Sequence, residues 1–360
     1  MKKAKKIAII VAVCMIVVGF ISAFTSFASV GFDVAQVDTV EWKTNTYEIE
    51  EAFENISIDG LEAAVTLVPS TDGTCKVVCT ENDNVYDEIK VENNTLTIKR
   101  MSKGKWNFNF GVSLEEPKIT VYLPKTEYKK LVLDNTSGRL EVPTDFTFEE
   151  AKVANSSGKI IFKADVSSAL SLENTSGGIE VGENQVGSLI VAGSSGGIQV
   201  ASVSVENDVQ VNSTSGGIHI SDVECKNIVA KGSSGSIRIS SVIAQENLDV
   251  NGTSGSIQLT DVECMNVTGE NSSGSIKCSN VIATGNMELE NSSGGISFEA
   301  CDAATIRFSA TSGSIRGGLL TPKNFIAEAT SGSVDVPKSA SGGLCEVSTT
   351  SGSIQIRVGE

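Results

Sequence analysis

The sequence predicts an all-β protein, a β-solenoid similar to a parallel β-helix and built from coils of 19–20 residues. The triplet Ser/Thr-Ser-Gly recurs with a fixed spacing of 19 or 20 residues, which is typical of stacked repeats that bury their apolar faces against their neighbours. Beside each triplet, apolar and polar residues alternate with the period of a strand. The abundance of glycine and β-branched residues argues against a helical repeat. The glycines of the triplets are residues 138, 158, 177, 196, 216, 235, 255, 274, 294, 313, 332 and 352.

The N-terminal segment predicts a membrane anchor. Residues 1–6 form a basic cytoplasmic tail, and the uncharged residues 7–28 form a transmembrane signal-anchor long enough to cross a hydrocarbon core of about 30 Å. The lysines stay inside by the positive-inside rule, so the remaining chain is expected outside the cell. The alternative is a signal peptide cleaved after Ser26-Phe27-Ala28.

A juxtamembrane linker, residues 29–45, then leads into an irregular β cap, residues 46–130. The cap contains strand-like segments separated by turn residues but lacks the fixed period, and it is expected to shield the first coil. Within it, Trp106, Phe108 and Phe110 lie close together in a loop that also carries two lysines. We consider this loop a possible partner contact, while packing over the end of the cap is the simpler interpretation.

The solenoid repeats are expected over residues 131–360. With each triplet glycine numbered zero, positions +2 and +4 are apolar throughout, except for Gly317, and positions −7 and −5 repeat the pattern before the triplet. Each coil therefore contains two short strands with inward-facing columns. The glycine between them is expected to supply the positive φ of a sharp corner. A looser segment around +7 to +12 absorbs the difference between 19 and 20 residues.

Five of the eight cysteines are expected to be reduced, although an exported protein favours disulfides. Cys225, Cys264, Cys278, Cys301 and Cys345 occupy columns that other coils fill with Val, Ile or Ala, so each is interpreted as a small buried hydrophobic residue. Cys225 and Cys264 lie two coils apart, roughly 10 Å, which is too far for a disulfide.

The acidic balance, a net charge of −16, disfavours nucleic acid as a partner. The turns have Ser and Thr where a calcium-loaded solenoid needs Asp, so no metal site is expected. No cofactor is expected either.

The order of segments resembles a known family. Phe53-Glu-Asn-Ile-Ser-Ile58, Lys118-Ile-Thr-Val-Tyr-Leu-Pro124 and the following Ser-Gly-x-Ile coils are similar to the bacterial putative-adhesin family with β-strand repeats, a domain of unknown function that includes LiaG-like envelope proteins. The resemblance covers nearly all of residues 46–360. It implies a β-solenoid attached to the cell membrane by a single pass, with the C-terminal domain extracellular. It transfers no catalytic or binding residue.

The sequence does not favour an enzyme. On the outward +3 column, only Glu141 and Glu180 come near the spacing of a catalytic carboxylate pair, and Ile161 lies between them. His219 has no visible nucleophile partner. No catalytic residue is predicted. The expected function is that of an adhesin or a display and interaction scaffold at the cell envelope, with an envelope protein or a surface glycan as the partner. The alternatives are a component that senses or scaffolds the response to envelope stress, and a polysaccharide-active β-helix enzyme.

Overall fold

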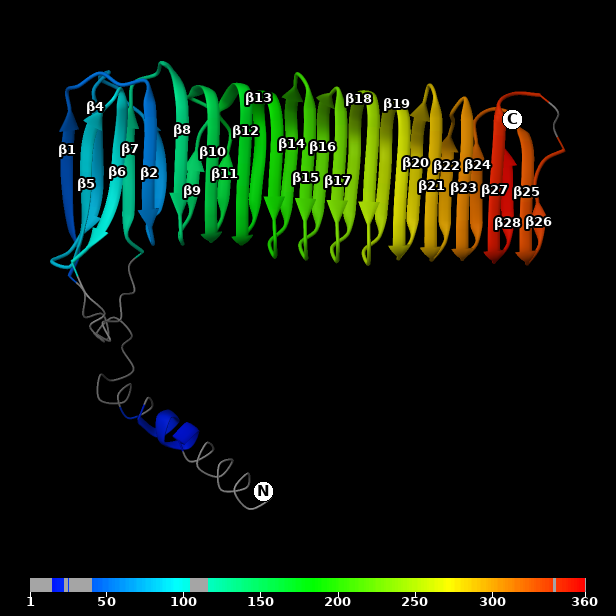
Figure 1. The fold of residues 1–360 in the computed structure, drawn as a ribbon, viewed down its shortest axis with the longest axis horizontal. Coiled ribbons are helices and arrows are strands. Elements are labelled where there is room, and N and C mark those ends of the chain that lie inside the picture. Colours follow the sequence, from blue (N-terminus) through cyan, green and yellow to red (C-terminus); the bar gives the residue numbers. More distant parts are fainter. Residues whose placement is uncertain (1–14, 23–24, 26–40, 104–115, 339–340, 360) are drawn as a thin grey trace.

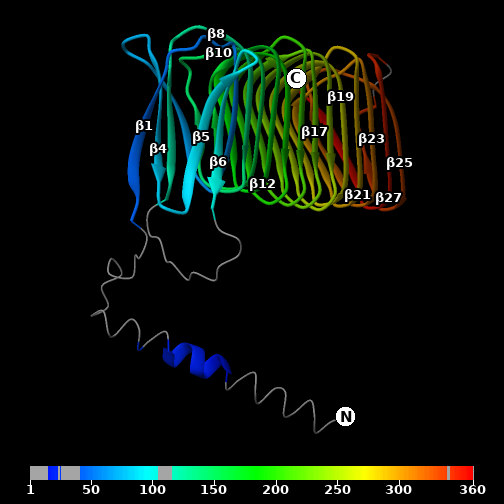
Figure 2. The same cartoon turned by 60° about the vertical axis from the view of Figure 1, so that its left-hand side comes forward.

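The chain forms a long rod in which every strand lies across the long axis (Figure 1). The computed structural model describes residues 15–22, 25, 41–103, 116–338 and 341–359. Seen obliquely, the coils are hoops stacked along the rod around a common interior (Figure 2). The prediction of an all-β solenoid with coils of about 20 residues is confirmed.

The hoops are flattened into two layers of strands. In spatial order along the rod, the first layer consists of β5 (Val85–Glu92), β6 (Thr95–Ser102), β2 (Asn55–Leu61), β8 (Glu127–Asn135), β10 (Thr147–Ser157), β12 (Asp165–Ser176), β13 (Ile179–Gly193), β15 (Asp208–Ser213), β17 (Asn227–Gly232), β18 (Ile237–Gly252), β19 (Ile257–Ser273), β21 (Asn286–Ser293), β23 (Thr305–Ser312), β27 (Leu344–Ser351) and β25 (Asn324–Ser331).

The second layer lies behind the first and closes the coils. In the same order it consists of β1 (Lys43–Ile49), β4 (Cys75–Glu81), β7 (Lys118–Leu123), β3 (Ala64–Pro69), β9 (Leu140–Val142), β11 (Ile160–Phe162), β13, β14 (Ile198–Val205), β16 (Ile218–Cys225), β18, β19, β20 (Ile276–Ala283), β22 (Ile296–Cys301), β24 (Ile315–Leu319), β28 (Ile354–Val358) and β26 (Val334–Asp335). The long strands β13, β18 and β19 contribute to both layers.

The coils do not stack in sequence order at either end of the rod. The coil of β2 and β3 lies between those of β6–β7 and β8–β9. At the other end, the last coil in the sequence, β27 and β28, lies between β23–β24 and β25–β26. Pro337, which follows β26, gives a physical reason for the second exchange. Proline lacks the N–H that an inner strand donates to its ladder, so its coil is better placed at the edge.

The core is formed by six inward columns in the regular coils of the rod. In the coil of Gly235, positions −7, −5, +2, +4, +7 and +9 are Ile228, Ala230, Ile237, Ile239, Val242 and Ala244, and all of them are buried. The predicted columns are thus confirmed, and the segment expected to be loose is regular as far as +9. The 19-versus-20 difference is absorbed after that point, where the register shifts between Ala244 and Asn247. Gly317 interrupts the +4 column because the Phe298 ring of the neighbouring coil occupies its space.

A second corner, which the sequence analysis missed, lies at position +6. Seven successive coils place a non-glycine residue there with φ between 51° and 59°: Glu183, Ser202, Asp222, Ser241, Asp261, Asn280 and Ala300. Asp, Asn and small residues tolerate this left-handed conformation better than most others do. The corner turns the chain between the +4 and +7 columns and keeps both columns facing inward.

The N-terminal end is closed differently from the solenoid. Here β1 and β7 both pair antiparallel with β4, and β5 pairs antiparallel with β6. The Arg100 guanidinium binds the Asp87 carboxylate through two hydrogen bonds of 2.7 and 3.0 Å, and both side chains are buried. This buried charge pair links β5 to β6 at the N-terminal end of the rod.

The described part of the N-terminal segment includes a helix over residues 15–22. Among the residues that the structure describes, no helix combines the length and the apolar character needed to span a membrane.

Candidate functional site

The Ser/Thr-Ser-Gly corners form a continuous edge of the rod, and stacking explains their glycines. At each of the twelve triplet glycines, an added Cβ would lie 1.6–2.6 Å from a backbone oxygen of a neighbouring coil. Only six of them have a φ in the left-handed region, from +102° to +155°. The expected reason for the glycine, a positive φ, therefore holds for half of the corners. The close approach of successive coils holds for all of them.

Position −3, just before the triplet, determines the shape of the corner. Where it is asparagine, the side chain is buried and its Nδ2 donates to the corner glycine carbonyl of the preceding coil. The distances are 2.7 Å from Asn174 to Gly158 O and 3.0 Å from Asn271 to Gly255 O. Asn155 and Asn291 make the same contact. These asparagines fill the inside of the corner.

Four successive coils between Asn174 and Asn271 lack this asparagine. Their −3 residues are Gly193, Ser213, Gly232 and Gly252. At Gly193 and Gly232, an added Cβ would lie 3.1–3.2 Å from the +2 isoleucine of the same coil. The backbone therefore packs directly on the core isoleucine there, and no side chain rises from the floor of the corner. This change of residue is visible in the sequence as Gly, Ser, Gly and Gly at −3 in place of asparagine, a signal that was missed.

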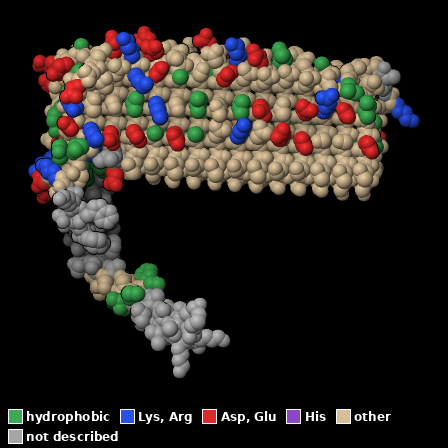
Figure 3. Space-filling view, in the orientation of Figure 1, with side chains coloured by type: hydrophobic (Ala, Val, Ile, Leu, Met, Phe, Trp, Pro, Cys, Tyr) green, Lys and Arg blue, Asp and Glu red, His purple; other side chains and the backbone are tan. Residues whose placement is uncertain are grey.

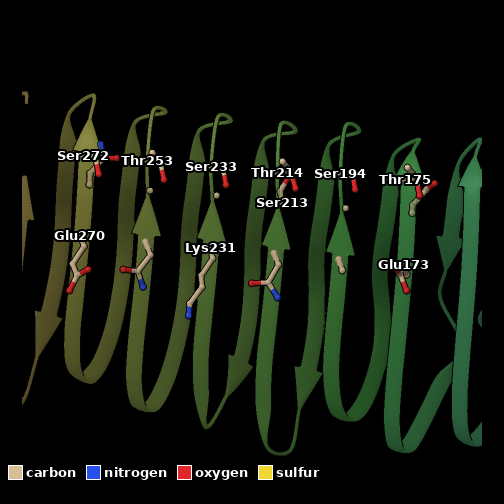
Figure 4. A pocket seen from close by; sticks show the side chains of 18 of the residues that line it. Glu173, Thr175, Ser194, Ser213, Thr214, Lys231, Ser233, Thr253, Glu270 and Ser272 are labelled. Carbon is tan, nitrogen blue, oxygen red and sulfur yellow. The ribbon is translucent and has the colours of Figure 1, made fainter.

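An open groove of about 710 Å³ includes these four coils and extends over the coils of Asn174, Asn271 and Asn291, seven coils in all and roughly 29 Å along the rod. We call it the corner groove. One side is a row of hydroxyl side chains at position −2, and the other side is position −4 (Figure 4). The hydroxyl row consists of Thr175, Ser194, Thr214, Ser233, Thr253, Ser272 and Ser292. The facing row consists of Glu173, Ala192, Asn212, Lys231, Asn251, Glu270 and Glu290.

The groove is polar, and its hydroxyl side carries no charge. The corners of the rod form a band without charged side chains along its lower edge in Figure 3. Hydroxyl and amide groups both donate and accept hydrogen bonds. None of the lining residues is aromatic. The groove can therefore bind a polar chain by repeated hydrogen bonds, but it offers no surface for stacking.

Glu141, Glu180 and His219, the residues considered for catalysis, lie on the outward +3 column. Glu141 accepts from Arg139 at 3.1 Å, and Glu180 is ion-paired with Lys159. The hydrogen bond from Lys159 lowers the pKa of Glu180, which favours the charged form over a proton donor. His219 is exposed, and its register neighbours are Gln199 and Arg238.

The described cysteines are buried and free, as expected from their columns. Burial raises the pKa of Cys225, Cys264 and Cys345 to about 12 and that of Cys75 to about 11. Their thiols stay protonated at neutral pH, which suits packing and not nucleophilic attack.

Two other predictions concern binding sites. Trp106, Phe108 and Phe110 lie in the stretch 104–115, outside the described residues. Within the described ranges, no group of three or more His, Cys, Asp or Glu side chains is placed to hold a metal ion.

Comparison with known proteins identifies a family. The model of the Toastrack DUF4097 family matches residues 53–207 and 173–357. This confirms the resemblance inferred from the Ser-Gly-x-Ile coils. No curated protein matches the chain.

Solved structures with some similarity include three bacterial proteins. A putative adhesin from Parabacteroides merdae is 14% identical, with 89% of this chain and 98% of that chain covered and a TM-score of 0.34. A putative lipid binding protein from Parabacteroides distasonis is 19% identical (88% and 97% covered, TM-score 0.33). A putative cell adhesion protein from Clostridium sporogenes is 10% identical (89% and 100% covered, TM-score 0.22). These scores are too low to bear on the function of this chain.

Proposed function

Because the chain belongs to the Toastrack DUF4097 family, we propose that it is an anchored extracellular rod that acts as an adhesin or interaction scaffold at the bacterial cell envelope. The N-terminal lysines and the uncharged segment that follows them support a single-pass anchor with the C-terminal domain outside. The observation that carries the binding role is the corner groove. It crosses seven coils and presents one hydroxyl side chain at every coil along one side.

We propose a polar surface polymer, such as a glycan, as the ligand of the corner groove. Each coil offers one hydroxyl side chain at −2, so a chain that lies along the rod meets a hydroxyl group at every step, while the side chains at −4 vary from coil to coil. Single contacts of this kind are weak, but their number gives useful avidity. An envelope protein remains the alternative partner.

We also propose that the chain is not an enzyme. The ion pairs of Glu141 and Glu180 and the register neighbours of His219 support this proposal.

A pair of tryptophan variants tests the groove. Thr214→Trp places a bulky side chain in the hydroxyl row, whereas Gln245→Trp adds the same side chain at an exposed site outside the groove. Binding of the purified chain to a glycan array and to isolated cell envelopes is measured for both variants and the wild type. We expect Thr214→Trp to lose binding and Gln245→Trp to retain it. Equal binding by the two variants would exclude the groove as the contact surface.

A further inference from the structure

The C-terminal end of the rod is an open edge. Its outermost coil consists of β25 and β26, which pair on one side only, with β27 and β28. The adjacent strand β27 has partners on both sides, β23 and β25. The outer edge of this coil therefore presents main-chain N–H and C=O groups that no described strand pairs.

The core is also incompletely covered at this end. Cys345 and Val347 of β27 are 0% and 1% exposed, but the corresponding Phe325 and Ala327 of β25 are only partly buried. Val334 in the +2 column is 43% exposed, whereas its neighbour Ile354 is 0% exposed. The end of the rod thus exposes a cross-section of the apolar core together with the free strand edges.

Strand β25 lacks the features that usually block pairing, whereas Pro337 follows β26 in the second layer. Strand β25 carries one charged residue, Glu328, and no proline. Natural edge strands are commonly protected by inward-pointing charges, proline or bulges. The N-terminal end, in contrast, is closed by antiparallel strands and the buried Arg100–Asp87 pair. It therefore does not match the parallel cross-section at the C-terminal end, and a head-to-tail contact is disfavoured.

We propose that the C-terminal tip docks onto the same tip of a second copy of this chain. A two-fold axis normal to both strand layers brings β25 antiparallel to β25 of the second copy. The first layer then continues across the junction, and the two partly exposed core ends cover one another. Such an interface is isologous, so it ends at a dimer and does not form a fibre.

Side-chain size and charge select the register of the two β25 strands. With Ala327 on the axis, Phe325 faces Ala329 of the second copy, which pairs a large side chain with a small one in the inward column. The same register places Glu328 opposite Ile326 and avoids a pair of facing glutamates. An axis through Glu328 would create that repulsion.

Self-association of the tip does not depend on the membrane anchor. If the proposed anchor is correct, the tip is the end of the rod farther from the membrane, since β1, the first strand after the anchor in the sequence, lies at the opposite end in Figure 1. The dimer would then connect rods from two apposed membranes, a step that rests on the proposed function.

Cysteine substitutions test the register in the full-length chain purified in mild detergent. Directly opposed antiparallel residues have Cα atoms about 4.5–5.5 Å apart, within disulfide range. Ala327→Cys is therefore expected to form a covalent dimer on mild oxidation. Ala329→Cys is the matched control on the same inward face. Its two copies would lie about 14 Å apart along the strands and should not form a bond.

A charge variant tests the association itself. Ala327→Lys is tolerated in a monomer, where the side chain reaches solvent, but two ammonium groups would be buried together in the dimer. We expect the dimer dissociation constant, measured by sedimentation, to rise by more than about tenfold. A wild-type chain that sediments as a monomer at all concentrations, or crosslinking of Ala329→Cys in preference to Ala327→Cys, would overturn the proposal. Loss of glycan binding by a chain that still dimerises would instead contradict only the proposed binding role of the corner groove.

Discussion

Two adjacent glycines allow the stacking requirement at the corner to be measured directly. An added Cβ on Gly216 would lie 1.8 Å from Gly196 O, whereas on Gly217 it would lie 3.4 Å from Ser236 O, an ordinary contact. Gly216→Ala and Gly217→Ala therefore make the same chemical change one residue apart. Only the first forces neighbouring coils to separate.

The size of the effect follows from the hydrogen bonds beside the contact. To reach 3.4 Å, the Gly216 methyl group must displace the neighbouring coil by 3.4 − 1.8 = 1.6 Å. Three main-chain bonds join these coils at the corner: Thr214 N to Gly193 O (3.1 Å), Ser215 N to Ser194 O (2.7 Å) and Ile198 N to Gly217 O (2.9 Å). A shift of that size would stretch them beyond bonding distance. At about 1 kcal/mol each, we expect a loss of about 3 kcal/mol for Gly216→Ala.

Urea denaturation followed by circular dichroism measures the difference. Gly217→Ala should stay within about 0.5 kcal/mol of the wild type, because its methyl group meets no backbone closer than an ordinary contact. The wild type provides the common reference, and hydrogen exchange at Ser215 and Ile198 reports whether the opening is local. Equal midpoints for the two alanine variants would refute the stacking explanation of the triplet glycine.

Three further outcomes are expected. Ile257→Asp places a carboxylate at a fully buried site between Ile237 and Ile276 and should lower the unfolding free energy by several kcal/mol. Gln258→Asp, on the exposed face of the same strand, should change the unfolding free energy by less than about 0.5 kcal/mol. Similar thermal shifts for the two variants would contradict the column register. Because burial raises the pKa of Cys225 and Cys264 to about 12, iodoacetamide at pH 8 should label them only after unfolding, and mass spectrometry showing rapid native labelling or a disulfide would contradict their place in the core. Protease added to intact cells should digest the repeats if the proposed orientation holds, and a mature N-terminus near Ser29 would show that the anchor is cleaved.

The sequence determined the features that repeat locally. The fixed spacing of the triplet glycines and the apolar alternation at −7, −5, +2 and +4 are written into every coil. They predicted the strands, the inward columns and the buried cysteines, because a residue's face in a strand depends on its immediate neighbours in the chain. The family resemblance came from the same repeated residues. The roles of the aromatic loop and of the N-terminal segment remain predictions.

Only the tertiary structure decided the order of the coils and the shape of the corner edge. Coils with similar columns can stack in more than one order, and nothing in the local pattern places β27 inside β25; Pro337 is the single clue. The corner groove is likewise formed by side chains of successive coils, and its floor differs between a coil with a −3 side chain, as at Asn174, and a coil without one, as at Gly193. Both features arise from contacts between residues about 20 or more positions apart, which an alternation of period two does not encode.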